Sequence, residues 1–180
     1  MTRMPDNPFD PSLWQPVEGF EQGAALRVVL DALGERDEIG WVRHLYALAT
    51  LRRDLLKRAG IPHAAIKGCF PVSSQLDLVF ANPTPGSGEA RIYEMFLSRA
   101  EDAEAASPIH QAVGNTTPFV LAWGEKDFPR IVRANEAMLR VLQRQPGPVE
   151  QHVFAGYDHF DMALDLARPE NPLVQTLRRH

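Results

Sequence analysis

The sequence predicts an α/β fold in which a parallel sheet of about three strands is flanked by helices. Short apolar runs alternate with segments of helical spacing through the second half of the chain. Two of these runs are followed by chemically active residues, an acid after residues 119–123 and a histidine after residues 150–154. Strands and helices that alternate in this way form βαβ units with right-handed crossovers.

Length and composition indicate a single globular domain. The chain has 180 residues, of which 44% are hydrophobic and 23% are charged, values close to the averages for globular proteins. A net charge of -4 makes nucleic acid and anionic membrane surfaces poor partners. No run approaches the roughly 18 apolar residues of a membrane span, and the N-terminus shows no signal-peptide core. We expect a cytoplasmic protein, which the single cysteine, Cys69, also fits.

Residues 1–23 are expected to form an extended, proline-rich arm, and residues 24–180 the folded domain. Four prolines stand among single large apolar residues in the arm, a pattern that disfavours a helix. Residues 24–59 show helical spacing, with leucines on one face. Gly34 and Gly40 interrupt the first part, which leaves two interpretations open there, two helices or a short strand followed by a helix.

The middle of the chain predicts one strand and one helix. Residues 64–72 are a short apolar run typical of a buried strand, in which Cys69 packs rather than reacts. Residues 82–88 have the composition of a loop. Residues 89–106 show helical spacing, which ends at a Ser-Pro pair.

The last third predicts the second and third strands. Residues 119–123 form an apolar run that ends at a glycine, and residues 131–142 have the spacing of an amphipathic helix. Residues 150–154 predict the third strand, which leads into a loop at His159. A final helix is expected over residues 172–179.

Four motifs between residues 66 and 161 resemble the C-terminal half of the α/β-hydrolase fold, in its esterase, lipase and formamidase branch. They are I-K-G-C-F-P-V-S-S-Q-L-D-L, A-S-P-I-H, W-G-E-K-D and Y-D-H-F-D, and the likeness covers about residues 44–180. In that family the triad follows the chain order serine, acid, histidine. The resemblance implies that Asp127 is the triad acid and His159 the general base. Enough residues lie between them for one crossover helix and one strand.

In these roles, Asp127 would accept the ring N–H of His159, fix its tautomer and stabilise the imidazolium. The residue patterns also allow non-catalytic, structural interpretations. Asp127 precedes Phe128-Pro129 and is a candidate helix N-cap. His159 is a candidate surface histidine between Asp158 and Asp161, which we expect to be solvated. No metal or cofactor is expected, because no second histidine lies at ligand spacing.

The departure from the family pattern concerns the nucleophile. The family places a serine in G-x-S-x-G, ahead of a helix that H-L-Y-A-L-A-T-L-R, residues 44–52, resembles. No such pentapeptide occurs in the chain, and Gly40 stands about where the serine belongs. Ser74 leaves a strand at the edge where Asp127 and His159 are expected, so it is either a substitute nucleophile or a strand-end serine bonded to local backbone. The chain is either a remnant whose front half was lost or replaced, or a shortened member with another role.

Three function classes follow. The first is hydrolysis of a small-molecule carboxylic ester or amide through an acyl-serine, impaired by the missing serine. The second is a non-catalytic module that forms a homo-oligomer through an exposed sheet edge, since a sheet without its front strands leaves backbone groups unpaired. The third is a CoA enzyme, because D-N-P-F-D-P-S-L-W-Q-P-V-E-G-F resembles the leader of naphthoyl-CoA synthases of the crotonase family.

Overall fold

A computed structural model of the chain describes residues 40–80, 83–97, 99–165, 170–171 and 174–175. The predicted arm of residues 1–23, which includes the crotonase-like leader, lies outside the described residues. So do residues 24–39, where two interpretations stay open, and most of the helix predicted over residues 172–179.

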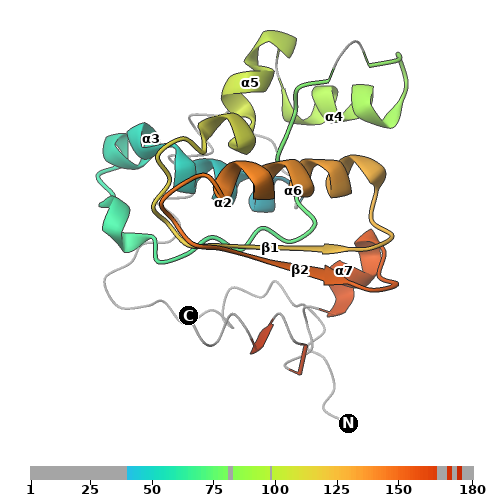
Figure 1. The fold of residues 1–180 in the computed structure, drawn as a ribbon. Helices are drawn as coiled ribbons and strands as arrows, with labels where there is room; N and C mark the ends of the chain where they lie inside the picture. Colours follow the sequence, from blue (N-terminus) through green and yellow to red (C-terminus); the bar gives the residue numbers. More distant parts are fainter. Residues whose placement is uncertain (1–39, 81–82, 98, 166–169, 172–173, 176–180) are drawn as a thin grey trace, which may run out of the picture.

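A βαβ unit forms the centre of the fold. Strand β1 (Phe119–Gly124) and strand β2 (Val149–Phe154) pair in parallel along their whole length. Helix α6 (Pro129–Leu142) connects them and packs on the sheet (Figure 1). Pro129 opens this helix at a position where the absent N–H leaves no intrahelical bond unmade. These three predicted elements are confirmed, each one or two residues longer than predicted.

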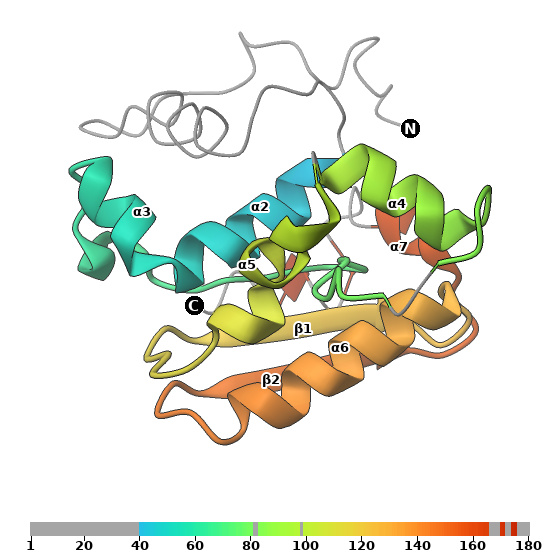
Figure 2. The same ribbon diagram turned by 90° about the horizontal axis from the view of Figure 1, so that it is seen from above.

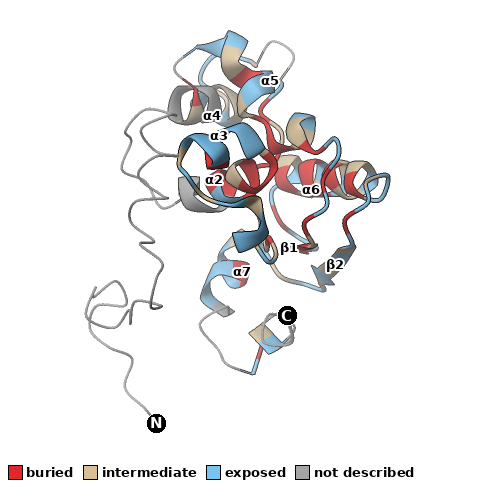
Figure 3. Ribbon diagram, turned by 90° about the vertical axis from the view of Figure 1, so that its left-hand side faces the viewer, coloured by how far each residue is buried: buried red, intermediate tan, exposed pale blue. Residues whose placement is uncertain are grey.

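The sheet packs against helices on both faces (Figures 1 and 2). One face lies against α6 and α2 (Gly40–Leu51), and the other against α7 (His159–Asp165). The buried side chains of the main core, on the α6 side, are Ala47, Leu51, Cys69, Leu76, Ala112, Phe119, Leu121, Trp123, Ala134, Met138 and Leu142. The smaller cluster, on the α7 side, consists of Val72, Val120, Ala122 and Met162. Strand β1 is buried throughout, whereas β2 is half-buried to exposed (Figure 3).

The first predicted strand, over residues 64–72, is wrong as a regular element. A short 3-10 helix, η2 (His63–Ala65), occupies its start. Further along, Cys69 and Val72 form only isolated parallel bridges to β1. The described residues therefore contain a sheet of two strands where about three were predicted. A third segment, residues 66–75, runs beside β1 from Cys69 to Ser73. The α/β class with a parallel sheet is confirmed.

Pro71 accounts for the interruption. Cys69 pairs with β1 as in a parallel ladder, since its carbonyl accepts the N–H of Val120 at 3.0 Å. The next N–H directed at β1 belongs to residue 71, and proline has none. The carbonyl of Pro71 still accepts from Ala122 N at 3.3 Å, and Ser73 N donates to Ala122 O at 2.8 Å. The segment thus follows β1 in register but lacks one hydrogen bond of the ladder.

Two predicted helical regions are divided into shorter helices where the structure describes them. The helical region ending at residue 59 is described from residue 40 onward, as α2 and α3 (Arg53–Arg58). The single helix predicted over residues 89–106 is wrong. It is divided into α4 (Gly88–Phe96), the 3-10 helix η3 (Ala100–Asp102) and α5 (Ala103–Ala106), after which η4 (Pro108–Gln111) follows.

A shared packing partner explains the break between α4 and α5. Arg99 has extended backbone, with φ of -145° and ψ of 141°, which ends the helical path. Leu97 and Ala103 are buried together with Leu78. On one straight helix these two positions would face directions roughly 120° apart. The break lets both side chains reach Leu78. Across the described part of the chain, every helix falls short of the length and apolar character of a membrane span.

Candidate active site

The loops at the carboxyl ends of β1 and β2 carry Asp127 and His159. These loops are joined by backbone hydrogen bonds, among them Lys126 N to Tyr157 O at 2.8 Å. Gly124 makes the close approach possible, because a Cβ at this position would collide with the backbone of Tyr157. The glycine in W-G-E-K-D therefore lets the loop that leads to His159 cross the end of β1.

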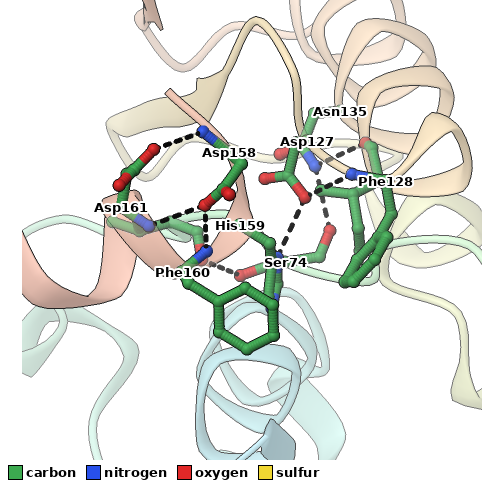
Figure 4. A network of polar contacts seen from close by, with 10 residues as sticks. Ser74, Asp127, Phe128, Asn135, Asp158, His159, Phe160 and Asp161 are labelled. Carbon is green, nitrogen blue, oxygen red and sulfur yellow. Dashed lines mark hydrogen bonds and ion pairs between the residues drawn. The ribbon is translucent and has the colours of Figure 1, made fainter. Parts of the chain in front are cut away.

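His159 is the first residue of α7, so the prediction of a loop at this position is wrong. Oδ1 of Asp158 accepts the N–H groups of Phe160 at 2.8 Å and Asp161 at 2.9 Å. In return, Oδ2 of Asp161 accepts the N–H of Asp158 at 3.0 Å. This reciprocal arrangement is a capping box (Figure 4). Both aspartates are exposed, as predicted, and together they fix the start of the helix that holds His159.

The structure brings Asp127 and His159 together. Nδ1 of His159 lies 2.9 Å from Oδ1 of Asp127, although the residues are 32 positions apart (Figure 4). The carboxylate can only accept, so Nδ1 carries the hydrogen and Nε2 is the basic atom. Within the described residues, Nε2 makes no hydrogen bond. The Asp127 side chain is 0% exposed and that of His159 is 30% exposed, so the pair is buried at the acid and accessible at the base.

The environment keeps the Asp127 carboxyl ionised. Burial by itself would raise its pKa, but the hydrogen bond to His159 and its charge, the nearby Ser73 hydroxyl and the N–H of Phe128 lower the pKa below its ordinary value. The Phe128 N–H reaches Oδ1 at 2.7 Å. Asp127 is therefore an anion at neutral pH, as a group that stabilises an imidazolium must be. Phe128, not Asp127, occupies the N-cap position of α6.

Aromatic rings flank the imidazole of His159. The ring centroids of Phe128 and Phe160 lie 5.0 Å and 6.0 Å from it. The guanidinium of Arg130 in turn lies 4.5 Å from the centroid of the Phe128 ring. The imidazole is therefore oriented by a carboxylate at Nδ1 and by contacts with two aromatic rings, one tilted and one edge-on.

Ser74, the predicted substitute nucleophile, lies in the third segment beside β1. The residue is 2% exposed, and its Oγ donates to the carbonyl of Val72 at 3.2 Å. None of the hydrogen bonds found between described residues joins Ser74 to His159. The geometry thus matches a strand-end serine bonded to local backbone. Gly40, where the resemblance places the serine, is the first residue of α2.

Sequence reasoning missed the buried polar side chains around this segment. Nδ2 of Asn135 donates to Ser74 O at 2.9 Å and to Ile131 O at 2.8 Å. Nδ1 of His44 lies 2.6 Å from Gln75 O, and burial lowers the pKa of this histidine, so it is a neutral donor. The sequence holds one signal for Asn135, which is a polar residue on the otherwise apolar face of α6. These contacts join residues 74 and 75 to α6 and α2.

Other reactive side chains stand apart from the pair. Cys69 is buried, as predicted, and burial raises the pKa of its thiol to about 12, which keeps it protonated. Among the residues that the structure describes, no group of three or more histidine, cysteine or acidic side chains is arranged to hold a metal ion.

Comparison with known proteins supports the fold. No protein-family model matches the sequence, and no curated protein is similar to it. Several solved structures are similar in fold. A thermostable esterase from Pseudomonas putida matches with a TM-score of 0.55 and 20% identity over 76% of this chain and 45% of the other. Esterase B from Lactobacillus rhamnosis matches with a TM-score of 0.54 and 16% identity, over 76% and 48%.

A carboxyl esterase from the fungus Tuber melanosporum gives a TM-score of 0.53 and 18% identity, over 75% of this chain and 47% of its own. These proteins are esterases with the α/β-hydrolase fold. The fold of this chain is therefore a partial α/β-hydrolase fold, as the four motifs predicted. The chain spans less than half the length of each of these structures.

Proposed function

We propose that the chain is an esterase-like α/β-hydrolase whose Asp127 and His159 are the acid and general base of a catalytic triad. The proposed substrate is a small carboxylic ester or amide. The observation that carries the proposal is the 2.9 Å contact between His159 Nδ1 and Asp127 Oδ1 at the carboxyl ends of adjacent parallel strands. The similarity in fold to esterases supports the same reaction class.

In this proposal, each member of the pair has a defined task. Nε2 of His159 takes the proton of a nucleophile and later returns it to the leaving group. The buried Asp127 carboxylate holds Nδ1–H and stabilises the imidazolium that forms between these steps. The 30% exposure of His159 is what a base needs if it is to reach a reacting group.

We propose further that turnover is impaired, because the chain has no G-x-S-x-G serine. Loss of the nucleophile from a serine triad lowers kcat by about 10⁶-fold. Gly40 has no side chain that could attack a carbonyl carbon. Ser74 remains the candidate substitute, although its hydroxyl is buried and bonded to Val72.

Hydrolysis of p-nitrophenyl acetate by the purified full chain tests both parts. We expect a rate near the buffer background in the wild type, and no change in Ser74→Ala. We expect Gly40→Ser to gain hydrolysis and to be labelled by a fluorophosphonate, and we expect His159→Gln or Asp127→Asn to abolish that gain. His110→Gln, a histidine away from the pair, is the matched control and should retain the gain.

The outcomes separate the alternatives. Fast hydrolysis by the wild type that Ser74→Ala abolishes would identify Ser74 as the nucleophile and refute the impairment. Hydrolysis that survives both His159→Gln and Asp127→Asn would refute the triad. Background rates in the wild type together with no gain in Gly40→Ser would also contradict the proposal.

A second candidate is a self-associating interaction module. In the described part of the sheet, β2 pairs with a strand on one side only, and Val153 within it is 51% exposed. An open edge of this kind offers backbone groups to another strand. Light scattering at micromolar concentration tests this candidate. A dimer that dissociates when Val153 is replaced by lysine supports it, and a stable monomer contradicts it.

A further inference from the structure

The backbone of Ser73 is strained. Its φ is 45°, and among the described residues it is the sole residue other than glycine with a positive φ. An L side chain is disfavoured in this region, and such a conformation persists only where its surroundings determine it. Ser73 makes the last backbone hydrogen bond of the third segment to β1, since its N–H donates to Ala122 O at 2.8 Å.

Long-range hydrogen bonds hold the chain immediately after Ser73. Asn135 in α6 donates to the carbonyl of Ser74 at 2.9 Å. His44 in α2 donates to the carbonyl of Gln75 at 2.6 Å. These bonds come from elements on both sides of the turn in sequence, so the turn has no freedom to relax around its strained residue. The surroundings therefore determine the direction of the Ser73 side chain.

Four buried polar atoms in or next to this turn have no hydrogen-bond partner among the described residues: Oγ of Ser73, Oε1 of Gln75, Oδ1 of Asn135 and Oδ2 of Asp127. Among these four, the Ser73 hydroxyl is the one donor, and Oδ2 of Asp127 is the one acceptor that carries charge. Oδ1 of Asp127 already accepts from Phe128 N at 2.7 Å and lies 2.9 Å from His159 Nδ1. A buried carboxylate oxygen without a donor is unfavourable, and a hydroxyl is the kind of donor it needs. The Ser73 hydroxyl is also among the groups that lower the pKa of Asp127.

We propose that Ser73 is a positioning residue whose hydroxyl donates to Oδ2 of Asp127 and so fixes the plane of the carboxylate that orients His159. The positive φ aims the hydroxyl at the end of β1, and the contacts of Ser74 and Gln75 maintain that aim. With Oδ1 held by Phe128 and His159 and Oδ2 held by Ser73, the carboxylate cannot rotate. The inference rests on the proposed role of Asp127 as the triad acid, but it makes no use of turnover.

Carboxyl carbon NMR titration of Asp127 in the full chain tests this inference. Removing a hydrogen bond to a charged group favours the protonated carboxyl, so Ser73→Ala is expected to raise the proton affinity of Asp127 about tenfold. Ser73→Gly removes the same hydroxyl and is expected to cause the same rise. Ser74→Ala is the matched control, because its hydroxyl is bonded to Val72 and should leave the Asp127 titration unchanged.

The two Ser73 variants differ in stability, which keeps the test interpretable. Glycine adopts a positive φ freely, so Ser73→Gly should unfold at a higher urea concentration than Ser73→Ala, which keeps the strain. A titration of Asp127 that is the same in Ser73→Gly and the wild type would refute the inference, and so would an equal shift in Ser74→Ala. If Asp127 responds to Ser73 but Gly40→Ser gains no hydrolysis, the positioning role stands while the proposed function fails.

Discussion

The βαβ unit of β1, α6 and β2 and the third segment, residues 66–75, lie side by side, yet they differ in regularity. The unit has an uninterrupted ladder and a connecting helix that covers its face. The segment keeps register with β1 but misses a hydrogen bond at Pro71 and contains the strained Ser73. The regular unit therefore positions the two candidate catalytic residues, and the irregular segment adds polar groups next to them.

The same division appears in the candidate site itself. Asp127 and His159 follow the ends of β1 and β2, so the parallel pairing of the strands brings them together. Phe128, which also donates to Asp127, follows it directly in the chain, whereas the other nearby polar groups come from elsewhere. Ser73 and the carbonyls that follow it belong to the segment, and Asn135 joins that segment to α6. Changes in the unit should therefore affect folding, whereas changes in the segment should affect the site with less effect on folding.

The largest expected effect comes from truncating a buried side chain at the centre of the unit, and it tests this division. Leu121 is fully buried between α6 and the sheet, so Leu121→Ala should lower the free energy of unfolding by about 2–5 kcal/mol. The matched change in the segment, Ile66→Ala, removes a half-buried side chain and should cost less than half as much. Urea unfolding followed by circular dichroism measures both. Equal losses would show that the segment contributes as much to folding as the unit does.

The regular unit was predictable from sequence, and the reason is local. The apolar runs of β1 and β2 and the spacing of Ile131, Ala134 and Met138 each indicate one structure, and packing agrees with them. The segment was predicted as a strand because its residues are apolar, but hydrogen bonding decides pairing, and Pro71 lacks the donor. The break between α4 and α5 depends on Leu78, a partner that spacing within the helix does not reveal.

The two central residues of the candidate site were predictable from sequence, and their surroundings were not. Chain order and family likeness placed Asp127 and His159 correctly beside each other, because both follow strands of a parallel sheet. Their surroundings were missed, since the contact of His44 with Gln75 joins elements with no common sequence pattern. Ser74 was considered because it is a serine at a strand end. The strain at Ser73, its neighbour, has no signature in residue type.

A smaller effect, in the irregular region, comes from pH. Burial lowers the pKa of His44 below the 6.5 of a free histidine, so the unfolded chain binds more protons than the folded chain as the pH falls below 6.5. The stability that the neutral His44 contributes is complete above this pH. It is lost on acidification, at a rate of at most about 1.4 kcal/mol per pH unit.

Urea unfolding between pH 7.5 and pH 5, the range chosen for the experiment, measures this loss, and His44→Asn should flatten it. The asparagine amide can replace the Nδ1 donor toward Gln75 without titrating, although it loses the ring contact with Phe96. The variant should therefore be less stable at pH 7.5 and less sensitive to acid. Hydrogen exchange should show that the stability lost at low pH is lost in α2 and the segment. If the decrease in the free energy of unfolding at low pH is unchanged in His44→Asn, groups other than His44 cause it.

The smallest effect on stability should come from restoring the missing hydrogen bond. Pro71→Val adds an N–H that faces the carbonyl of Val120, in the place where a parallel ladder continues. The new bond contributes about 0.5–1.5 kcal/mol, and the freer unfolded chain offsets about 0.4–1 kcal/mol of it. The free energy of unfolding should change by less than about 1 kcal/mol, while the amide of residue 71 gains protection against hydrogen exchange.

Pro62→Val, which replaces an exposed proline in the same region, is the control and should create no protected amide. If the new amide of the Pro71→Val variant exchanges as fast as an exposed one, a missing donor is not what interrupts the strand predicted over residues 64–72. Protection at residue 71 with an unchanged Asp127 titration would show that the segment can pair regularly without disturbing Ser73. Protection accompanied by a raised proton affinity of Asp127 would show that the irregular pairing itself aims the Ser73 hydroxyl, because regular pairing then draws the turn away from the acid.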